Sequence, residues 1–578
     1  MFTDSQLKKI LISQKAFAKK EIEDFLEKAQ EKNVGLAEYL QANKLINEER
    51  LYQLAADYFK VPYIDLDDKN LHKEALFVIP ETIAQTHKIV AFNKTDKELE
   101  VATLDPQDIE MFEFLKKKHN LQIKVYLTAP SSISMALKAY RHGLKAEFGQ
   151  MEHKKTKADE DEKDGKGLKK LAEDLPVIRV VDTLLEYAII EGASDIHIEP
   201  LEKEIMVRYR IDGILRNVMT LPKSIHAGVV ARIKIIANLK LDEHRLPQDG
   251  RFKIATQEYK VSFRVSIIPT FDGEKVVMRL LNEKFQLLDL GELGLQPKAL
   301  AIIKINIKKP HGMILVTGPT GSGKTTTLYT ILNILNTPKV NISTIEDPIE
   351  YRMPHVNQSQ VNPKIGFTFA NGLRAFLRQD PDIIMVGEIR DKETAEIAVH
   401  AAMTGHLVLS TLHTNDAVTT LPRLHDMGIP SFLISTTTNV IVAQRLVRKI
   451  CKKCVESYNL AKQDIEELEK QLDLKSILTT LEQEGVINQK KQTINSLLFY
   501  RGKGCKECNF SGYKGRVGIY EILEITSDIG ELISKRVTTD QLKEAAEKQG
   551  MLTILEDGFI KAKQGVTTIE EVLRVSKE

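Results

Sequence analysis

The sequence predicts an α/β fold, and the clearest observation is a strand pattern that runs into a glycine-rich loop and then a helix. Met313-Ile314-Leu315-Val316 is entirely apolar, and residues 318–325 have the spacing G-x-x-x-x-G-K-[ST]. After this loop, apolar strand patterns alternate with helical patterns, as they do in open α/β sheets. A helical repeat at the N-terminus and a second α/β pattern ahead of the loop complete the predicted architecture.

The first element along the chain is a repeat in which each copy has apolar residues at helical spacing. The matching positions are Leu7, Leu11, Phe17 and Ile22 in the first copy and Leu36, Leu40, Ile46 and Leu51 in the second. Each copy is typical of two short helices. Because the strand pattern 99–103 follows, we expect residues 1–145 to form a mainly helical module with a small α/β unit.

Three further regions follow this module. Residues 146–170 are rich in Lys, Asp, Glu and Gly and poor in apolar residues, a composition that predicts a charged, flexible linker. Residues 171–290 show an α/β pattern with strand-like segments at 203–211 and 259–265. Residues 291–578 carry the glycine-rich loop and should form a nucleotide-binding α/β domain.

Length and composition limit the possible classes. A chain of 578 residues suggests roughly four domains. The net charge of +2, from 82 basic and 80 acidic residues, gives no overall indication of nucleic-acid binding. The sequence has neither a long uninterrupted apolar run nor the layout of a secretion signal at its start. We therefore expect a cytoplasmic protein that touches a membrane only through partners.

The glycine-rich loop predicts a site for a nucleoside triphosphate. Glycines at 318, 321 and 323 let backbone N–H groups approach the phosphates, and the following helix contributes the positive end of its dipole. Lys324 can reach the β- and γ-phosphates, while Thr325 can ligate Mg²⁺. A chance glycine turn would lack the flanking strand and helix. The loop comprises Gly318, Pro319, Thr320, Gly321, Ser322, Gly323, Lys324, Thr325 and Thr326.

Two acidic segments after the loop are candidates for the chemistry of hydrolysis. Glu350 lies in the segment 344–351, and Glu388 follows the apolar strand pattern that begins at Asp382. Ligands in parallel sheets bind beyond the carboxyl ends of strands, so Glu388 should face the Mg²⁺–phosphate region. Alone, either acid would be read as a solvated residue at a strand end. A third segment, 404–415, contains His406 and His413, and core histidines that bond to backbone carbonyls are the usual explanation for such residues.

The cysteines predict a structural metal site. All four occur in two C-x-x-C pairs, which is the spacing of a tetrahedral zinc site. Four thiolates leave no open coordination position, so a catalytic metal is not expected. The alternative is a redox C-x-x-C motif, which does not explain two matched pairs. The pairs are Cys451 with Cys454 and Cys505 with Cys508.

Together these motifs resemble the secretion ATPases that drive type II secretion and type IV pilus assembly (GspE-like and PilB-like). The resemblance covers the loop 318–326, an aspartate box at 344–351, a Walker B segment at 382–391 and a histidine box at 404–415. Residues 193–200 and 246–251 look like motifs of the family's preceding domain. The resemblance implies a RecA-like P-loop ATPase domain, preceded by a PAS-like α/β domain and a mainly helical N-terminal module.

The resemblance also implies roles for individual residues. Glu350 corresponds to the acid that polarises the attacking water, and Glu388 to the Walker B acid that holds Mg²⁺ through water. His413 would lie near the γ-phosphate as a sensor. Arginines of the preceding domain would neutralise charge on a nucleotide across a subunit boundary, with a surface salt bridge as the alternative for each. The candidates are Arg208, Arg210 and Arg216.

The resemblance implies partners as well. Members of this family form homo-hexameric rings and work through an inner-membrane platform protein (PilC/GspF-like), with a cytoplasmic scaffold as a further candidate partner. The N-terminal repeat is similar to the MshEN module, which in some relatives binds cyclic di-GMP through an Arg-Leu-Gly at the start of each repeat. Here the matching positions read Gln6-Leu7-Lys8 and Gly35-Leu36-Ala37. We therefore expect the packing to be retained and cyclic di-GMP binding to be lost.

The function we expect is that of a cytoplasmic hexameric motor that hydrolyses Mg²⁺-ATP to assemble a type IV pilus, with Zn²⁺ as a structural ion. The zinc element at 451–508 and the N-terminal extension favour an assembly or export motor over a retraction motor. A type II secretion motor and a motor for a DNA-uptake pseudopilus share the same motifs. Two other classes are a scaffold that binds ATP without hydrolysis and a nucleic-acid translocase, which the near-neutral charge disfavours.

Overall fold

The structure of the protein, a computed structural model, describes residues 2–576 apart from several segments and single positions. The chain divides into two compact units, Met1–Ile254 with Val261–Leu280 and Ala255–Lys260 with Leu281–Glu578, and each is described by itself. The linker predicted at 146–170 lies outside the described residues. The positions not described are 3, 32–33, 44, 67–70, 77, 80–83, 85–86, 96, 120, 138–170, 173, 256–259, 283–288 and 488–493.

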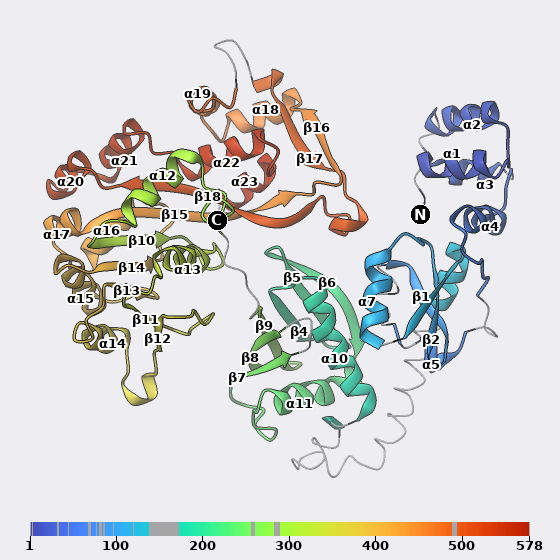
Figure 1. The fold of residues 1–578 in the computed structure, drawn as a ribbon, viewed down its shortest axis with the longest axis horizontal. Coiled ribbons are helices and arrows are strands. Elements are labelled where there is room, and N and C mark those ends of the chain that lie inside the picture. Colours follow the sequence, from blue (N-terminus) through green and yellow to red (C-terminus); the bar gives the residue numbers. More distant parts are fainter. Residues whose placement is uncertain are drawn as a thin grey trace. The chain divides into compact units, whose positions relative to one another are not determined.

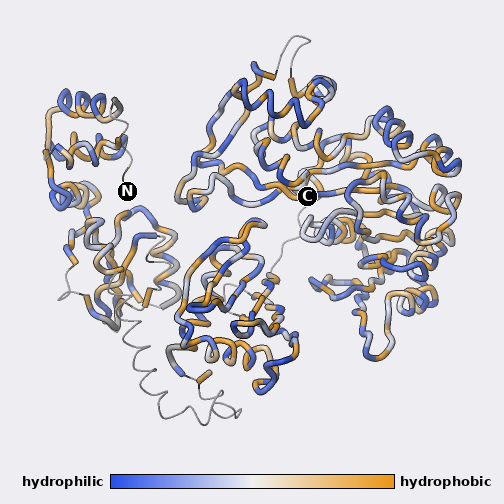
Figure 2. The backbone as a smooth tube through the Cα atoms, turned by 180° about the vertical axis from the view of Figure 1, so that it is seen from behind, coloured by the Kyte–Doolittle hydropathy of each residue, from blue (hydrophilic) through white to orange (hydrophobic). Residues whose placement is uncertain are grey.

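The N-terminal repeat forms four helices, which confirms the prediction of two per copy. They are α1 (Asp4–Ser13) and α2 (Lys19–Glu31), followed by α3 (Leu36–Ala42) and α4 (Glu48–Phe59). Equivalent positions of the two copies are buried in the same way. The buried pairs are Leu7 with Leu36, Leu11 with Leu40, and Ile22 with Leu51. Figure 2 shows polar and apolar residues alternating along these helices, as expected for helices packed on one face.

The small α/β unit of this region is built on three strands in the order β1-β2-β3. β1 runs antiparallel to β2, and β3 runs parallel to β2. The second strand coincides with the predicted segment 99–103. Its elements are α5 (Lys73–Leu76), β1 (Ile89–Lys94), β2 (Glu98–Thr103), α7 (Ile109–His119) and β3 (Gln122–Leu127).

The next region contains a six-stranded sheet in the order β6-β5-β4-β9-β8-β7. Along β5 the side chains of Val207 and Tyr209 are buried, and the Tyr209 hydroxyl donates a hydrogen bond to the Leu184 carbonyl on α10. The elements are α10 (Leu175–Ile190), β4 (Asp195–Pro200), β5 (Glu204–Ile211), β6 (Ile214–Pro222), α11 (His226–Ile236), β7 (Gln248–Ala255), β8 (Lys260–Thr270) and β9 (Gly273–Asn282).

The second unit is built on a seven-stranded sheet in the order β12-β11-β13-β14-β10-β15-β18 (Figure 1). All neighbours in this sheet are parallel except β15 and β18. The strand before the glycine-rich loop, β10, therefore lies between two parallel neighbours. The strands are β10 (Gly312–Thr317), β11 (Ile342–Glu346), β12 (Asn357–Gln360), β13 (Ile383–Val386), β14 (Leu407–Leu412), β15 (Thr438–Ile450) and β18 (Tyr513–Glu524).

Helices cover both faces of this sheet. Ile314 and Val316 of β10 pack in one buried cluster with residues of α12 (Pro297–Asn306) and α13 (Lys324–Leu335). Met313 and Leu315 point to the opposite face and belong to a buried cluster that includes, among others, residues of three helices near the sheet. Those helices are α14 (Phe369–Phe376), α15 (Lys392–Met403) and α17 (Ser431–Thr437). The strand is buried on both sides, which explains its uninterrupted apolar sequence.

A further core lies in the C-terminal part of this unit. It joins β17 and the helices α18 and α19 to α22 and α23. In the part of the chain that the structure describes, no helix is long and apolar enough to cross a membrane. The remaining elements are α16 (Thr420–Asp426), β16 (Val455–Asn459), α18 (Lys462–Glu469), α19 (Leu474–Gln483), β17 (Leu498–Gly502), α20 (Ser527–Ser534), α21 (Thr539–Lys548), α22 (Ile554–Lys563) and α23 (Ile569–Ser576).

Candidate nucleotide site and tetracysteine cluster

The glycine-rich loop connects β10 directly to the first residue of α13, as the sequence predicted. Gly318, Gly321 and Gly323 have φ values of 138°, 82° and 88°, in the region that other residues rarely adopt. At Gly318 and Gly323 there is also no room for a Cβ atom, which would lie 2.4 Å and 2.8 Å from atoms of Gln444. The glycines are therefore required both by backbone conformation and by the close approach of β15.

Lys324 opens α13 and folds back over the loop. Its Nζ donates hydrogen bonds to the carbonyls of Gly318 at 2.7 Å and Pro319 at 3.1 Å. Burial lowers the pKa of Lys324 to about 8, although the negative charge of Glu388 acts in the opposite direction. The ammonium group is thus close to the loop and to the Walker B acid, where anionic phosphates would restore its ordinary pKa.

Glu388 follows β13 and lies close to Arg390, His413 and Lys324. Its carboxylate pairs with Arg390 at 2.7 Å and with Nε2 of His413 at 3.3 Å, and it acts electrostatically on Lys324. The segment that carries His413 is tied to the loop strand, because Thr317 Oγ1 lies 2.6 Å from Thr414 Oγ1 and accepts the Thr414 N–H. The sheet therefore brings the loop, the Walker B acid and the histidine box together at the carboxyl ends of β10, β13 and β14.

The aspartate box differs from the prediction in one detail. We expected Glu350 to stand at a strand end, whereas β11 ends at Glu346 and Glu350 lies in the irregular segment that follows. Glu346 is buried and accepts hydrogen bonds from Tyr329, from Thr344 at 2.6 Å and from Gln358 at 3.2 Å. Burial raises the pKa of Glu346, and the nearby charge of Glu350 raises it further.

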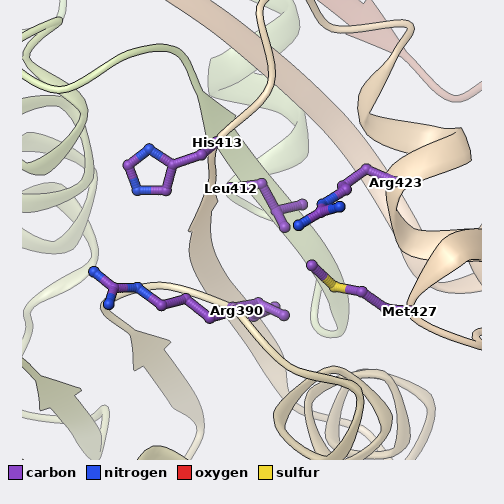
Figure 3. A pocket seen from close by; sticks show the side chains of 6 residues that line it. Arg390, Leu412, His413, Arg423 and Met427 are labelled. Carbon is purple, nitrogen blue, oxygen red and sulfur yellow. The ribbon is translucent and has the colours of Figure 1, made fainter.

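A pocket of about 440 Å³ opens beside the Glu388–His413 pair. Figure 3 shows Arg390 and His413 on one side of it, with Arg423 of α16 and Met427 on the other. The apolar, buried residues Ile389 and Leu412 also line it. Two arginines and a histidine around one opening favour an anionic group in or near this pocket.

The four cysteines converge although the two pairs are far apart in sequence. The Sγ atoms all lie within 4.8 Å of one another, and no disulfide links them. Cys451 Sγ lies 3.7 Å from Cys505 Sγ, and Cys454 Sγ lies 3.8 Å from Cys508 Sγ. Tetrahedral zinc with Zn–S bonds of about 2.3 Å requires sulfur–sulfur distances of about 3.8 Å. The cluster is therefore compatible with one structural zinc ion.

The three candidate arginines lie in the other compact unit, on β5 and β6. Arg208 pairs with Glu199 at 2.7 Å, and Arg210 lies 3.5 Å from Asp195. Both alternate with buried residues of β5, so they share one face of the sheet. Arg216 is paired with Tyr209 in the β5–β6 ladder. Because Tyr209 alternates with Arg208 and Arg210, this register position belongs to the opposite face of the sheet. The three arginines thus do not form a single group.

Sequence reasoning missed several residues of the candidate site. Glu346 was not singled out, because nothing in the segment 344–351 distinguishes an acid at the end of a strand from one in the loop that follows. Arg390 stood inside the Walker B segment without an assigned role, and Arg423 and Gln444 have no motif around them that points to a nucleotide. Their proximity to the site arises from strand order, which local patterns do not reveal.

Comparison with known proteins gives the following matches. Residues 170–574 match the family model described as type II/IV secretion system protein, and residues 59–147 match the MshEN domain. The type IV pilus assembly ATPase PilB of Myxococcus xanthus is 40% identical over 573 residues, covering 98% of both chains. The type II secretion system ATPase E of Vibrio cholerae is 47% identical over 406 residues, covering 70% of this chain and 76% of its own. A crystal structure of the pilus retraction motor PilT with bound ADP is 29% identical, with a TM-score of 0.45, and covers 69% of this chain and 96% of its own.

Proposed function

Because this chain belongs to the type II/IV secretion system protein family and is an ATP hydrolase with a RecA-like domain, we propose that it powers assembly of a type IV pilus. One observation carries this proposal. Three type IV pilus assembly ATPases match over 95–98% of this chain at 38–40% identity, and a type II secretion protein that matches over 95% of the chain is 38% identical. The type II secretion motor remains the second candidate, since the identity with a secretion ATPase reaches 47% over 406 residues.

In the proposed reaction the loop N–H groups and Lys324 hold the triphosphate. Thr325 and Glu388 would hold Mg²⁺, the threonine directly and the glutamate through water. Glu350 would polarise the attacking water, and His413, already 3.3 Å from the Glu388 carboxylate, would sense the γ-phosphate. Lys324 and the bound metal would neutralise the charge that develops on the phosphoryl group in the transition state.

The proposed assembly is a homo-hexameric ring in which arginines of one subunit complete the nucleotide site of the next. The face of the sheet that carries Arg208 and Arg210 supports this, because Lys275 and Arg279 bind the same two acids there. Four cations against two carboxylates leave that face with an excess of positive charge. An interface between unlike surfaces of identical subunits closes into a ring when the rotation from one subunit to the next is a whole fraction of a turn without translation.

The proposed setting is the cytoplasmic face of the inner membrane, where a platform protein of the PilC/GspF type would receive the motion. A cytoplasmic scaffold protein is a further candidate partner for the N-terminal module. We propose no specific nucleic-acid partner and no cyclic di-GMP binding. Zn²⁺ held by the four cysteines would brace β15 against the segment that leads into β18. Metal analysis of the purified protein tests this assignment. We expect one zinc ion per chain, and a protein that contains no zinc would contradict it.

Phosphate release from Mg²⁺-ATP, measured together with the mass of the assembly, tests the core of the proposal. Lys324→Ala should lower turnover by about a hundredfold or more, because it removes a charge that contacts the transferred phosphoryl group. Lys339→Ala, at an exposed lysine of the same unit, is the matched control and should retain parental turnover. Hydrolysis by the Lys324→Ala protein at the parental rate would contradict the site assignment.

A cellular experiment separates the two candidate functions. In a strain that lacks the gene, the parental protein should restore surface pili and the Lys324→Ala protein should not. Restoration of exoprotein release without pili would favour the type II secretion motor instead.

A further inference from the structure

Gln444 of β15 is a buried polar residue next to the phosphate loop. Its side chain is almost completely buried, with 1% of its surface exposed, in a strand whose neighbouring residues Val442 and Ala443 are apolar and buried. A buried amide is costly unless its donor and acceptor are both used. The contacts of this side chain therefore indicate what it is for.

The amide of Gln444 contacts the loop and the helix that follows it. Its Nε2 donates a hydrogen bond to the Ser322 carbonyl at 2.8 Å, and its Oε1 accepts one from Thr327 Oγ1 at 2.7 Å. These partners stand on either side of Lys324 and Thr325, which bind phosphate and metal in the proposed reaction. One side chain from a distant strand thus spans the part of the loop that carries the chemistry.

The bond to Ser322 sets the direction of a backbone donor. The peptide that joins Ser322 to Gly323 is planar and trans, so its C=O and N–H point in opposite directions. Because the carbonyl is held toward β15, the Gly323 N–H is directed away from β15, toward the side on which a phosphate would lie. A peptide flip would exchange a donor for an acceptor and repel the phosphate.

The packing around Gln444 makes this contact close. A Cβ atom on Gly323 would lie 2.8 Å from Nε2 of Gln444, and one on Gly318 would lie 2.4 Å from its carbonyl oxygen. The loop therefore lies against β15 at both of its ends. Because no other residue fits between them, Gln444 contacts the loop directly.

We propose that Gln444 is a positioning residue that holds the phosphate loop in its nucleotide-binding conformation. The inference rests on the proposed function. It adds a residue that nucleotide binding requires and that lies outside the phosphate loop, the aspartate box, the Walker B segment and the histidine box. A side chain of equal length without hydrogen-bonding groups would remove the bonds from Gln444 to the Ser322 carbonyl and the Thr327 hydroxyl. The peptide between Ser322 and Gly323 could then rotate. Nucleotide affinity should then fall more than stability does.

The test compares Gln444→Met with the control Val442→Ala. Both change a buried side chain of β15, but only Gln444 bonds to the loop. Binding of a fluorescent ADP in the presence of Mg²⁺ and the melting temperature are measured for each full-length protein. For Gln444→Met the Kd should rise about tenfold, whereas Val442→Ala should keep its Kd within about twofold at a similar loss of melting temperature.

A second variant separates the two bonds of the amide. Gln444→Glu keeps an acceptor for Thr327 but loses the donor to Ser322, so its Kd should also rise by about tenfold or more. Parental affinity in both Gln444 variants would overturn the proposal, as would an equal loss of affinity in Val442→Ala. A parental protein that binds no nucleotide would overturn the proposed function and this inference together, whereas the other two results would overturn only the role of Gln444.

Discussion

The sheet of the nucleotide site and the sheet that carries the arginines place their polar residues in different ways. In the first, parallel strands end at one edge, so Lys324, Glu388 and His413 meet within one unit. In the second, antiparallel strands distribute residues over two faces, and Arg208 and Arg210 are already paired with acids of their own domain. The first arrangement brings its polar residues together within one unit, whereas the second carries positive charge that, in the proposed ring, would act on the nucleotide of a neighbouring subunit.

Changes at the nucleotide site should have the largest effect on ATP turnover. Glu350→Gln should lower ATP turnover by about a thousandfold, because in the proposed reaction Glu350 polarises the attacking water, and the phosphate contacts stay in place. Nucleotide affinity should stay within about threefold, measured by titration with a fluorescent ADP. The neighbouring Glu346→Gln is the comparison, since that carboxylate is occupied by Tyr329 and Thr344. If Glu346→Gln alone abolished turnover, the two roles would have to be exchanged.

Changes to the arginines of β5 should have a smaller effect on ATP turnover. This effect should be visible only in assembled protein. The double variant Arg208→Gln with Arg210→Gln should lose about a hundredfold in turnover, because in the proposed ring these arginines neutralise charge on the γ-phosphoryl group of the adjacent subunit. Arg216→Gln, on the opposite register face, should lose less than about threefold in the same assay.

Mixed assemblies sharpen this comparison. Subunits with Lys324→Ala and subunits with the double arginine change should each have little activity alone. In a mixture, some interfaces combine the intact loop of one subunit with the intact arginines of its neighbour. Partial recovery of turnover in the mixture is therefore expected. Failure to recover any turnover would restrict the arginines to ion pairs within their own domain.

The smallest expected effect is a pH dependence confined to the nucleotide site. Burial lowers the pKa of Lys324 to about 8 in the empty site, and phosphates raise it again on binding. Binding then takes up a proton above pH 8, so affinity is constant below that pH and falls as pH rises through it. Between pH 7 and pH 9 the Kd for ADP should rise about tenfold. A Lys324→Arg protein should lose this dependence, because arginine keeps its charge over that range; an unchanged slope would assign the proton to another group.

Much of the site could be predicted because its motifs are short and local. The strand, the three glycines and Lys324 lie within a few residues of one another, so their conformation follows from backbone preferences and helix geometry. The cysteine pairs were also recognisable from spacing, although Cys451 and Cys505 are 54 residues apart. Glu346 was not recognised, because strand ends depend on pairing with neighbours as much as on sequence.

The sequence by itself determined the phosphate loop, the acids and histidine that follow it, the two cysteine pairs and the helical repeat, since each depends on residues close together in the chain. Only the tertiary structure decided that Gln444 supports the loop and that Arg208 and Arg210 share a face from which Arg216 is separated. The reason is physical: strand order and register set which distant residues meet, and a shift of one position moves a side chain to the other face of a sheet.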